Sequence, residues 1–193
     1  MSMKKWRLDF RIWHWIHAVV ILGLLGTVFL RKTFLSWRAN SEILIQKLSD
    51  INLEITSEQA KVLAKAIRAP MWEWHIILGY ALVILLVWRV QLFFTYSGNL
   101  NYQNLKEETF FKKMVKLGYI GIYGVLIFMA ISGLMIHFHE ALALTKDAAH
   151  DIKEIHELVF YAVLIFVPLH IIGVFIAENQ DEKGIISDMV NGG

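Results

Sequence analysis

Two histidines stand out in the last apolar stretch of the chain, which covers residues 155–177. His156 lies at the start of this stretch, and His170 lies deep inside it, fourteen residues further on. On an α-helix this spacing gives an axial rise of roughly 21 Å and a rotation about 40° short of a full turn, so both imidazoles lean towards one side. An ionisable side chain at membrane depth is a candidate functional residue, because hydrocarbon penalises it unless something binds it.

The other apolar stretches carry histidines at matching depths. Successive spans alternate in direction, so the start of the first span, with His14, shares a face with the end of the last span, with His170. His75, just inside the second span, shares the opposite face with His156. The sequence therefore predicts two pairs, His14 with His170 and His75 with His156, one in each leaflet.

Paired imidazoles on facing helices are typical of haem b, whose iron can take one axial histidine from each side. The chain has no cysteine, which excludes cysteine-ligated iron–sulfur clusters and thioether-attached haem. Cofactor sites of this kind are commonly built in the interior of helix bundles. We therefore predict two haem b groups, with a haem-free, histidine-lined metal transporter as the alternative from another functional class.

Other histidines compete for the same roles. His17 is one turn from His14 and could replace it as a ligand. His137 and His139 end the third span on the face of His75, and either could replace that residue. An interfacial position is the alternative reading for these two, and also for His150 in the connector that follows.

Charged residues near the histidines are candidates for supporting roles. Haem propionates need cations, and Arg7 and Arg11 are suitably placed beside His14, although a first helix commonly has such a basic flank. A ligating imidazole usually donates its second N–H to a carboxylate or carbonyl. The carboxylates closest in sequence to the predicted ligands are Glu73, Glu154 and Glu157.

Glycines near the predicted ligands would let a flat macrocycle approach the backbone; they are Gly23, Gly26, Gly79 and Gly173. Close packing of helices is the other explanation for small residues in apolar spans. We prefer that explanation for three glycines of the third span, namely Gly118, Gly121 and Gly124.

The composition is that of a polytopic membrane protein. The chain has 193 residues, of which 56% are hydrophobic and 19% charged, and its mean hydropathy is +0.50. Runs of about twenty apolar residues are long enough to cross a bilayer. The net charge of +2 is too small to suggest binding to nucleic acid. No small-residue cleavage site follows the first run, so we read it as a retained helix rather than a signal peptide.

These observations predict an all-α fold, a four-helix transmembrane bundle that forms one integral-membrane domain over residues 1–193. The spans are expected at about 12–30, 71–94, 114–136 and 155–177, with a polar connector at 95–113. A short extramembrane connector at 33–69 has amphipathic helical patterns around 42–48 and 59–67, and Thr56 to Gln59 form a capping-box motif. Six of the seven tryptophans lie at span ends, where an interfacial belt is expected: Trp13, Trp15, Trp37, Trp72, Trp74 and Trp88.

The segments that carry the histidines resemble a known family. RIWHWIHAVVILGLL in the first span, WEWHIILGYALV in the second and IHELVFYAVLIFVPLHIIGV in the fourth are similar to the bacterial di-haem b-type cytochromes. That family includes the membrane subunits of nickel–iron hydrogenases and formate dehydrogenases, and stand-alone quinone-linked cytochromes b. The resemblance covers all four spans, and the spacing of fourteen residues in the last span is its most specific part.

This resemblance implies four haem ligands, namely His14, His75, His156 and His170. It also implies electron exchange with quinone in the bacterial inner membrane, with the N-terminus in the cytoplasm. Four spans then place the C-terminus on the same side. The long connector departs from the family's pattern. Surface helices that lie at the membrane interface are one reading of it, and a docking surface for a soluble or periplasmic redox partner is the other. A stand-alone haem oxidoreductase, of the superoxide oxidase or ferric reductase type, is the alternative to an electron-transfer subunit.

Overall fold

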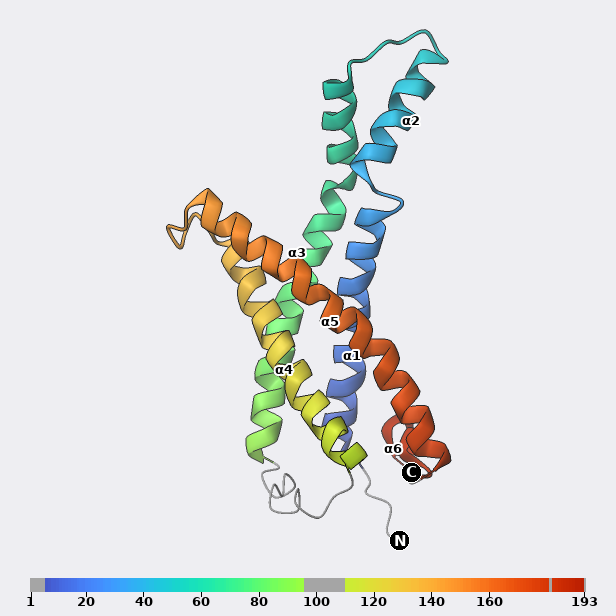
Figure 1. Cartoon of the computed structure of the whole chain (residues 1–193), viewed down its shortest axis with the longest axis vertical. Helices are drawn as coiled ribbons and strands as arrows, with labels where there is room; N and C mark the ends of the chain where they lie inside the picture. Colours follow the sequence, from blue (N-terminus) through green and yellow to red (C-terminus); the bar gives the residue numbers. More distant parts are fainter. Residues whose placement is uncertain (1–5, 96–109, 181, 193) are drawn as a thin grey trace. The chain divides into compact units, whose positions relative to one another are not determined.

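The computed structural model of the protein describes residues 6–95, 110–180 and 182–192. Within these ranges all regular secondary structure is helical, which confirms the predicted all-α class. Figure 1 traces the helices in chain order; their bounds are α1 (Leu8–Lys32), α2 (Trp37–Ser49), α3 (Ser57–Thr95), α4 (Phe110–His137), α5 (Lys146–Asn179) and α6 (Ile185–Val190). The predicted polar connector at 95–113 lies mostly outside the described residues.

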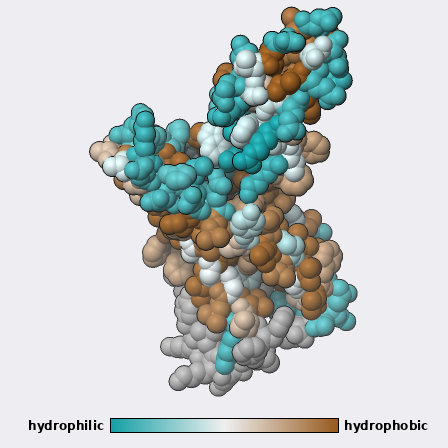
Figure 2. Space-filling view, turned by 45° about the horizontal axis from the view of Figure 1, so that its top comes forward, coloured by the Kyte–Doolittle hydropathy of each residue, from teal (hydrophilic) through white to brown (hydrophobic). Residues whose placement is uncertain are grey.

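Four of these helices, α1, α3, α4 and α5, are long and apolar enough to cross a membrane. Large apolar side chains on them are exposed: Val19 is 67% exposed, Ile84 67% and Leu158 69%. Figure 2 shows hydrophobic side chains over much of the visible face. Contact with water would penalise such a surface, whereas lipid tails are as apolar as these side chains. The chain is therefore a multi-pass membrane protein whose long helices contact lipid.

Helix α3 is longer than the sequence predicted, because the amphipathic pattern at 59–67 and the second span form one continuous helix of 39 residues. Its start has the predicted capping box: the Gln59 side chain accepts from the Thr56 N–H at 2.8 Å, and Thr56 Oγ1 accepts from the Gln59 N–H at 3.2 Å. Pro70 lies inside the helix rather than at its start. Since proline lacks an N–H, it removes one helical hydrogen bond at the beginning of the expected span.

Helix α2 packs against the first turns of α3, where Ala60 and Ala64 are fully buried. Trp37, the first residue of α2, lies under two lysines of α3, with its ring centroid 5.5 Å from Lys61 Nζ and 5.9 Å from Lys65 Nζ. Cation–π contacts of this kind fix the start of α2 against α3.

The chain divides into two compact units. The first unit comprises Met1–Ala18 and Leu82–Gly193, and the second comprises Val19–Ala81. The first unit therefore holds the beginning of α1, the end of α3 and all of α4, α5 and α6. The second holds the rest of α1, all of α2 and the beginning of α3.

Helix α5 carries His156 and His170. It starts at Lys146, nine residues before the predicted span, and Thr145 caps it by accepting the Ala148 N–H at 3.2 Å. The helix continues through Pro168 to Asn179 and packs along α4. His156 and His170 thus project from one helix that lies in one unit.

Candidate functional site

The structure brings the rings of His14 and His170 close together. Their centroids are 6.3 Å apart and their planes are inclined by 53°. Metal–imidazole bonds are about 2 Å long, and two such bonds plus the radii of the two rings add up to about 6 Å. The separation between α1 and α5 at this point therefore suits one metal ion held between two imidazoles.

The ring of His14 has a polar atom that is left without a protein partner. Its Nδ1 atom is buried and has no hydrogen-bond partner among the described residues. The ring meets Trp15 edge to face at 5.3 Å. A buried polar atom without a partner is costly, so a ligand is expected to bind this imidazole.

His17, the alternative to His14, is placed differently. Its ring stacks on Trp13, with centroids 4.8 Å apart and planes 18° from parallel. Its Nε2 atom is also buried and has no partner in the described part of the chain. Of the two histidines on this turn of α1, it is His14 whose ring faces His170.

His170 is held by two aromatic side chains. The Tyr119 hydroxyl of α4 lies 3.2 Å from His170 Nδ1. The Phe166 ring stacks on the imidazole at 5.8 Å and 10°. Pro168, two residues earlier, lacks a backbone N–H, and the Tyr119 and Phe166 contacts hold the His170 ring.

His156 forms a hydrogen bond with a serine of α4. Ser132 Oγ lies 2.7 Å from His156 Nδ1, and the serine is only 2% exposed. The same hydroxyl donates to the carbonyl of Phe128 at 2.7 Å. Gly133 lies beside the ring, and a Cβ atom there would stand in ordinary contact, 3.5 Å from His156 Cε1.

His75 lies in the other unit and repeats this arrangement. Thr27 Oγ1 of α1 is 2.7 Å from His75 Nδ1 and donates to the Leu24 carbonyl at 2.6 Å. Trp72 stacks on the imidazole at 5.2 Å, with planes 7° from parallel. The structure thus gives each histidine of the second predicted pair a defined environment within its own unit.

The hydroxyl groups determine which ring nitrogen carries hydrogen. A hydroxyl has one hydrogen, and Ser132 and Thr27 each direct it to a carbonyl of their own helix. They must therefore accept from the imidazole, which places hydrogen on Nδ1 and leaves the Nε2 lone pair of His156 and His75 available to a metal.

Glu73, Glu154 and Glu157 were the candidate partners from the sequence, whereas the Nδ1 atoms of His156 and His75 have hydroxyl partners. Glu154 pairs with His150 at 3.2 Å, and Glu157 pairs with Lys153 at 3.3 Å. The serine and threonine carry no sequence signal for this role, because each comes from a different helix than its histidine. Only the helix packing shows the relation.

The histidines at the end of α4 have local contacts. His139 Nδ1 lies 3.1 Å from the carbonyl of Ile136, and its Nε2 lies 4.0 Å from Glu140 Oε1. The His137 ring meets Phe138 edge to face at 4.7 Å. Among the described residues, these side chains form no cluster of three that could hold a metal ion.

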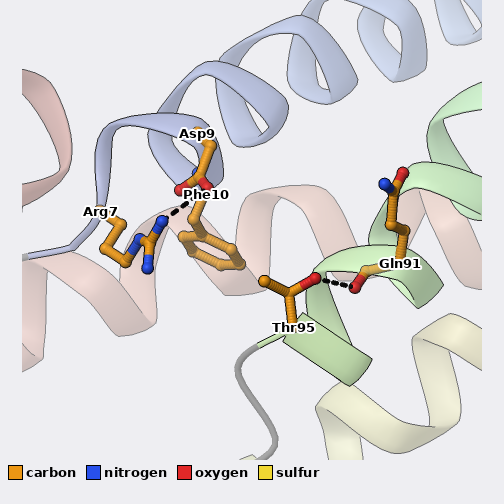
Figure 3. Close-up of polar contacts among 5 residues, drawn as sticks. All are labelled: Arg7, Asp9, Phe10, Gln91 and Thr95. Atoms are coloured by element: carbon orange, nitrogen blue, oxygen red, sulfur yellow. Dashed lines mark hydrogen bonds and ion pairs between the residues drawn. The ribbon is translucent and has the colours of Figure 1, made fainter.

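The two arginines predicted to support the site have protein partners. Arg7 pairs with Asp9 at 3.5 Å on the surface, as Figure 3 shows. The guanidinium of Arg11 donates to the carbonyls of Met189 and Val190, the last residues of α6. Arg11 therefore fastens the C-terminal helix to the start of α1.

The glycines of the third span have open space within their unit. A Cβ atom added at Gly118, Gly121 or Gly124 would meet no described atom of this unit within 4 Å, so packing inside the unit does not explain them. The same is true of Gly173, one turn after His170. Open space beside a predicted ligand suits a flat cofactor. Together with the ring separation and the unpartnered Nδ1 of His14, it gives these residues a fit to haem b.

Comparison with known proteins agrees with this fit. Residues 5–192 match a family model described as prokaryotic cytochrome b561. No curated protein and no solved structure matches the chain.

Proposed function

The chain belongs to the prokaryotic cytochrome b561 family, and we propose that it holds two haems and exchanges electrons with quinone. As a member of this family it is a membrane protein that binds haem b and transfers electrons. The second redox partner is proposed to dock at the outer membrane face. When bound, haem b supplies reversible one-electron transfer at its iron. The protein's own residues provide the axial ligands, their orientation and a site without water.

His14 and His170 are proposed to hold the first haem, and His75 and His156 the second. The separation of 6.3 Å between the His14 and His170 rings is the observation that carries this proposal. Two histidines on one helix, fourteen residues apart, give α5 a ligand for each site. Arg7 and Arg11 remain predicted contacts of the propionates on the His14 side.

The second pair is supported by its hydroxyl partners. Ser132 and Thr27 keep a proton on Nδ1 of His156 and His75, so that the Nε2 lone pair of each ring would be free to bind a haem iron. Both hydroxyl residues are buried, and this keeps competing water away from the hydrogen bonds. His75 and His156 therefore have the tautomer that an axial ligand needs.

The proposed setting is the bacterial inner membrane, with both termini in the cytoplasm and residues 1–193 acting as one domain. Lipid surrounds the apolar helices, and quinone is a lipid-soluble molecule that can reach the protein from the bilayer. The connector between α1 and α3, with α2 in its middle, is the proposed contact for the outer redox partner.

Replacement of ligands tests this function directly. Wild-type protein is expected to contain two haem b per chain, and His170→Ala is expected to contain one, with the loss of one of two low-spin signals. His17→Ala is the matched control, because its ring stacks on Trp13 and is expected to leave both haems in place. Two intact signals in His170→Ala would refute the proposed pairing.

A further inference from the structure

Arg89 of α3 is a half-buried cation inside a cage of aromatic rings. Its guanidinium carbon lies 5.3 Å from the ring centroid of Phe10, 5.5 Å from that of Trp13 and 5.4 Å from that of Tyr123. Its Nε–H also donates to the Tyr123 hydroxyl at 3.0 Å. Phe10 and Trp13 belong to α1 and Tyr123 to α4, so three helices of one unit meet at this residue.

The cage leaves the charge of Arg89 uncompensated. No carboxylate among the described residues pairs with this guanidinium. Aromatic faces attract a cation, but they offset only part of the free energy that is lost when an arginine leaves water for a membrane span. A guanidinium also has five N–H donors, and Tyr123 takes one of them. An anion is therefore the missing partner.

Two of the cage residues connect Arg89 to the His14 and His170 pair. Trp13 directly precedes His14 in α1. Tyr123 follows Tyr119 by one turn of α4, and the Tyr119 hydroxyl contacts His170 Nδ1. On α4 the cage residue Tyr123 and the His170 contact Tyr119 therefore lie on one helix face, and on α1 the cage residue Trp13 adjoins His14 in the sequence.

The junction between α1 and α3 is firmly fixed at this point. The indole N–H of Trp13 donates to the carbonyl of Leu85, one turn before Arg89, at 2.8 Å. Trp13 is only 2% exposed and so is a core residue, whereas the sequence placed it in the interfacial tryptophan belt. Burial and this hydrogen bond hold the cage residue beside Arg89.

The other arginines near this pair have protein partners, Asp9 for Arg7 and two carbonyls of the C-terminal helix for Arg11. We propose that Arg89 binds a propionate carboxylate of the haem held by His14 and His170. The inference rests on the proposed function. A planar guanidinium can meet a carboxylate with two parallel hydrogen bonds, and its positive charge stabilises the extra electron of the reduced haem.

Redox titration of the full-length protein tests this role. Arg89→Gln removes the positive charge, so the midpoint potential of the His14/His170 haem is expected to fall. Arg89→Lys keeps the charge and is expected to restore most of the potential. Arg38→Gln is the matched control, because its guanidinium lies over the Trp37 ring in α2, outside the predicted spans, and this variant is expected to leave the potential unchanged. Unchanged potentials in Arg89→Gln would overturn the proposal, even if that variant were less stable.

A second measurement applies if Arg89→Gln does not fold. In the charge-conserving Arg89→Lys variant, the infrared carboxylate band of isotope-labelled haem propionates is expected to shift from its wild-type frequency. An unshifted band would overturn the proposal. Haem counting separates the two levels of failure: a wild-type chain without two haems contradicts the proposed function, whereas two haems that are insensitive to Arg89 contradict only this inference.

Discussion

The hydroxyl of Ser132 donates its only hydrogen to a carbonyl of α4 and accepts from the imidazole of His156. In Ser132→Ala the imidazole N–H loses this acceptor in a buried position. Loss of an outer partner typically weakens metal binding about 10–100-fold. We expect haem at His156 to be lost more readily by about that factor, and its midpoint potential to rise because the imidazole becomes less basic. Haem release to an acceptor protein and redox titration measure the two effects.

Ser132→Thr is the matched control for this prediction, since it keeps the hydroxyl at the same position. It is expected to retain both haem affinity and potential. For His75 the equivalent variants are Thr27→Val and Thr27→Ser. Weaker haem binding is expected only in Thr27→Val, which lacks the hydroxyl. Equal rates of haem release and equal midpoint potentials in Ser132→Ala and Ser132→Thr would contradict the assignment of hydrogen to Nδ1 of His156.

Single residues also mark the limit of prediction from the sequence. Residue type and depth were enough to suggest His14 with His170, because the direction of each span follows from counting spans. The partners of the imidazoles could not be predicted in this way. Glu154 and Glu157 are neighbours of His156 in sequence, but Ser132 reaches it from a different helix. The cation cage of Arg89 was missed for the same reason, since its rings come from two other helices.

At the scale of elements, the apolar stretches predicted which helices exist but not where they end. Helices α3 and α5 both extend well beyond their apolar parts, because Thr56 and Thr145 supply caps in polar sequence. Pro70 suggested a boundary, yet the helix tolerates it. Proline disfavours a helix interior by about 3 kcal/mol, and the long helix that surrounds it offsets this effect.

The short helix α6 gives a prediction at this scale. The Glu178 carboxylate accepts the backbone N–H groups of Gly184 at 2.9 Å and Ile186 at 3.0 Å, and so holds the start of α6 against the end of α5. Glu178→Gln weakens both hydrogen bonds, because a charged acceptor binds more strongly than a neutral one. We expect faster proteolysis within residues 182–192. Limited digestion with mass spectrometry of the fragments measures this rate.

Glu154→Gln serves as the control for that digestion, because this carboxylate pairs with His150 far from the tail in sequence. It is expected to leave the rate of cleavage within 182–192 unchanged. If Glu178→Gln is also cleaved at the wild-type rate, Arg11 and Trp15 alone hold the helix through the carbonyls of Met189 and Val190.

For the whole molecule, four apolar helices and membership of a haem b family describe a membrane cytochrome. The haem-free transporter considered from the sequence is wrong, because the family binds haem b. If all four apolar helices cross the membrane, both termini lie on the same side.

The absence of cysteine makes this topology easy to test. Glu54→Cys, between α2 and α3, is expected to react with a membrane-impermeant maleimide in intact spheroplasts. Glu182→Cys, in the exposed stretch before α6, is expected to react only after the membrane is opened. The opposite labelling pattern would invert the proposed orientation and place the connector in the cytoplasm.

The meeting of His14 with His170 has a consequence for how the protein is made. One ring belongs to α1 and the other to α5, so the residue on α1 is synthesised first. Newly made segments fold from the N-terminus onwards, so the imidazole of α1 waits without this partner until α5 has been synthesised. Chains terminated before α5 therefore cannot assemble this site, and loading of a cofactor there would report that synthesis has passed α5.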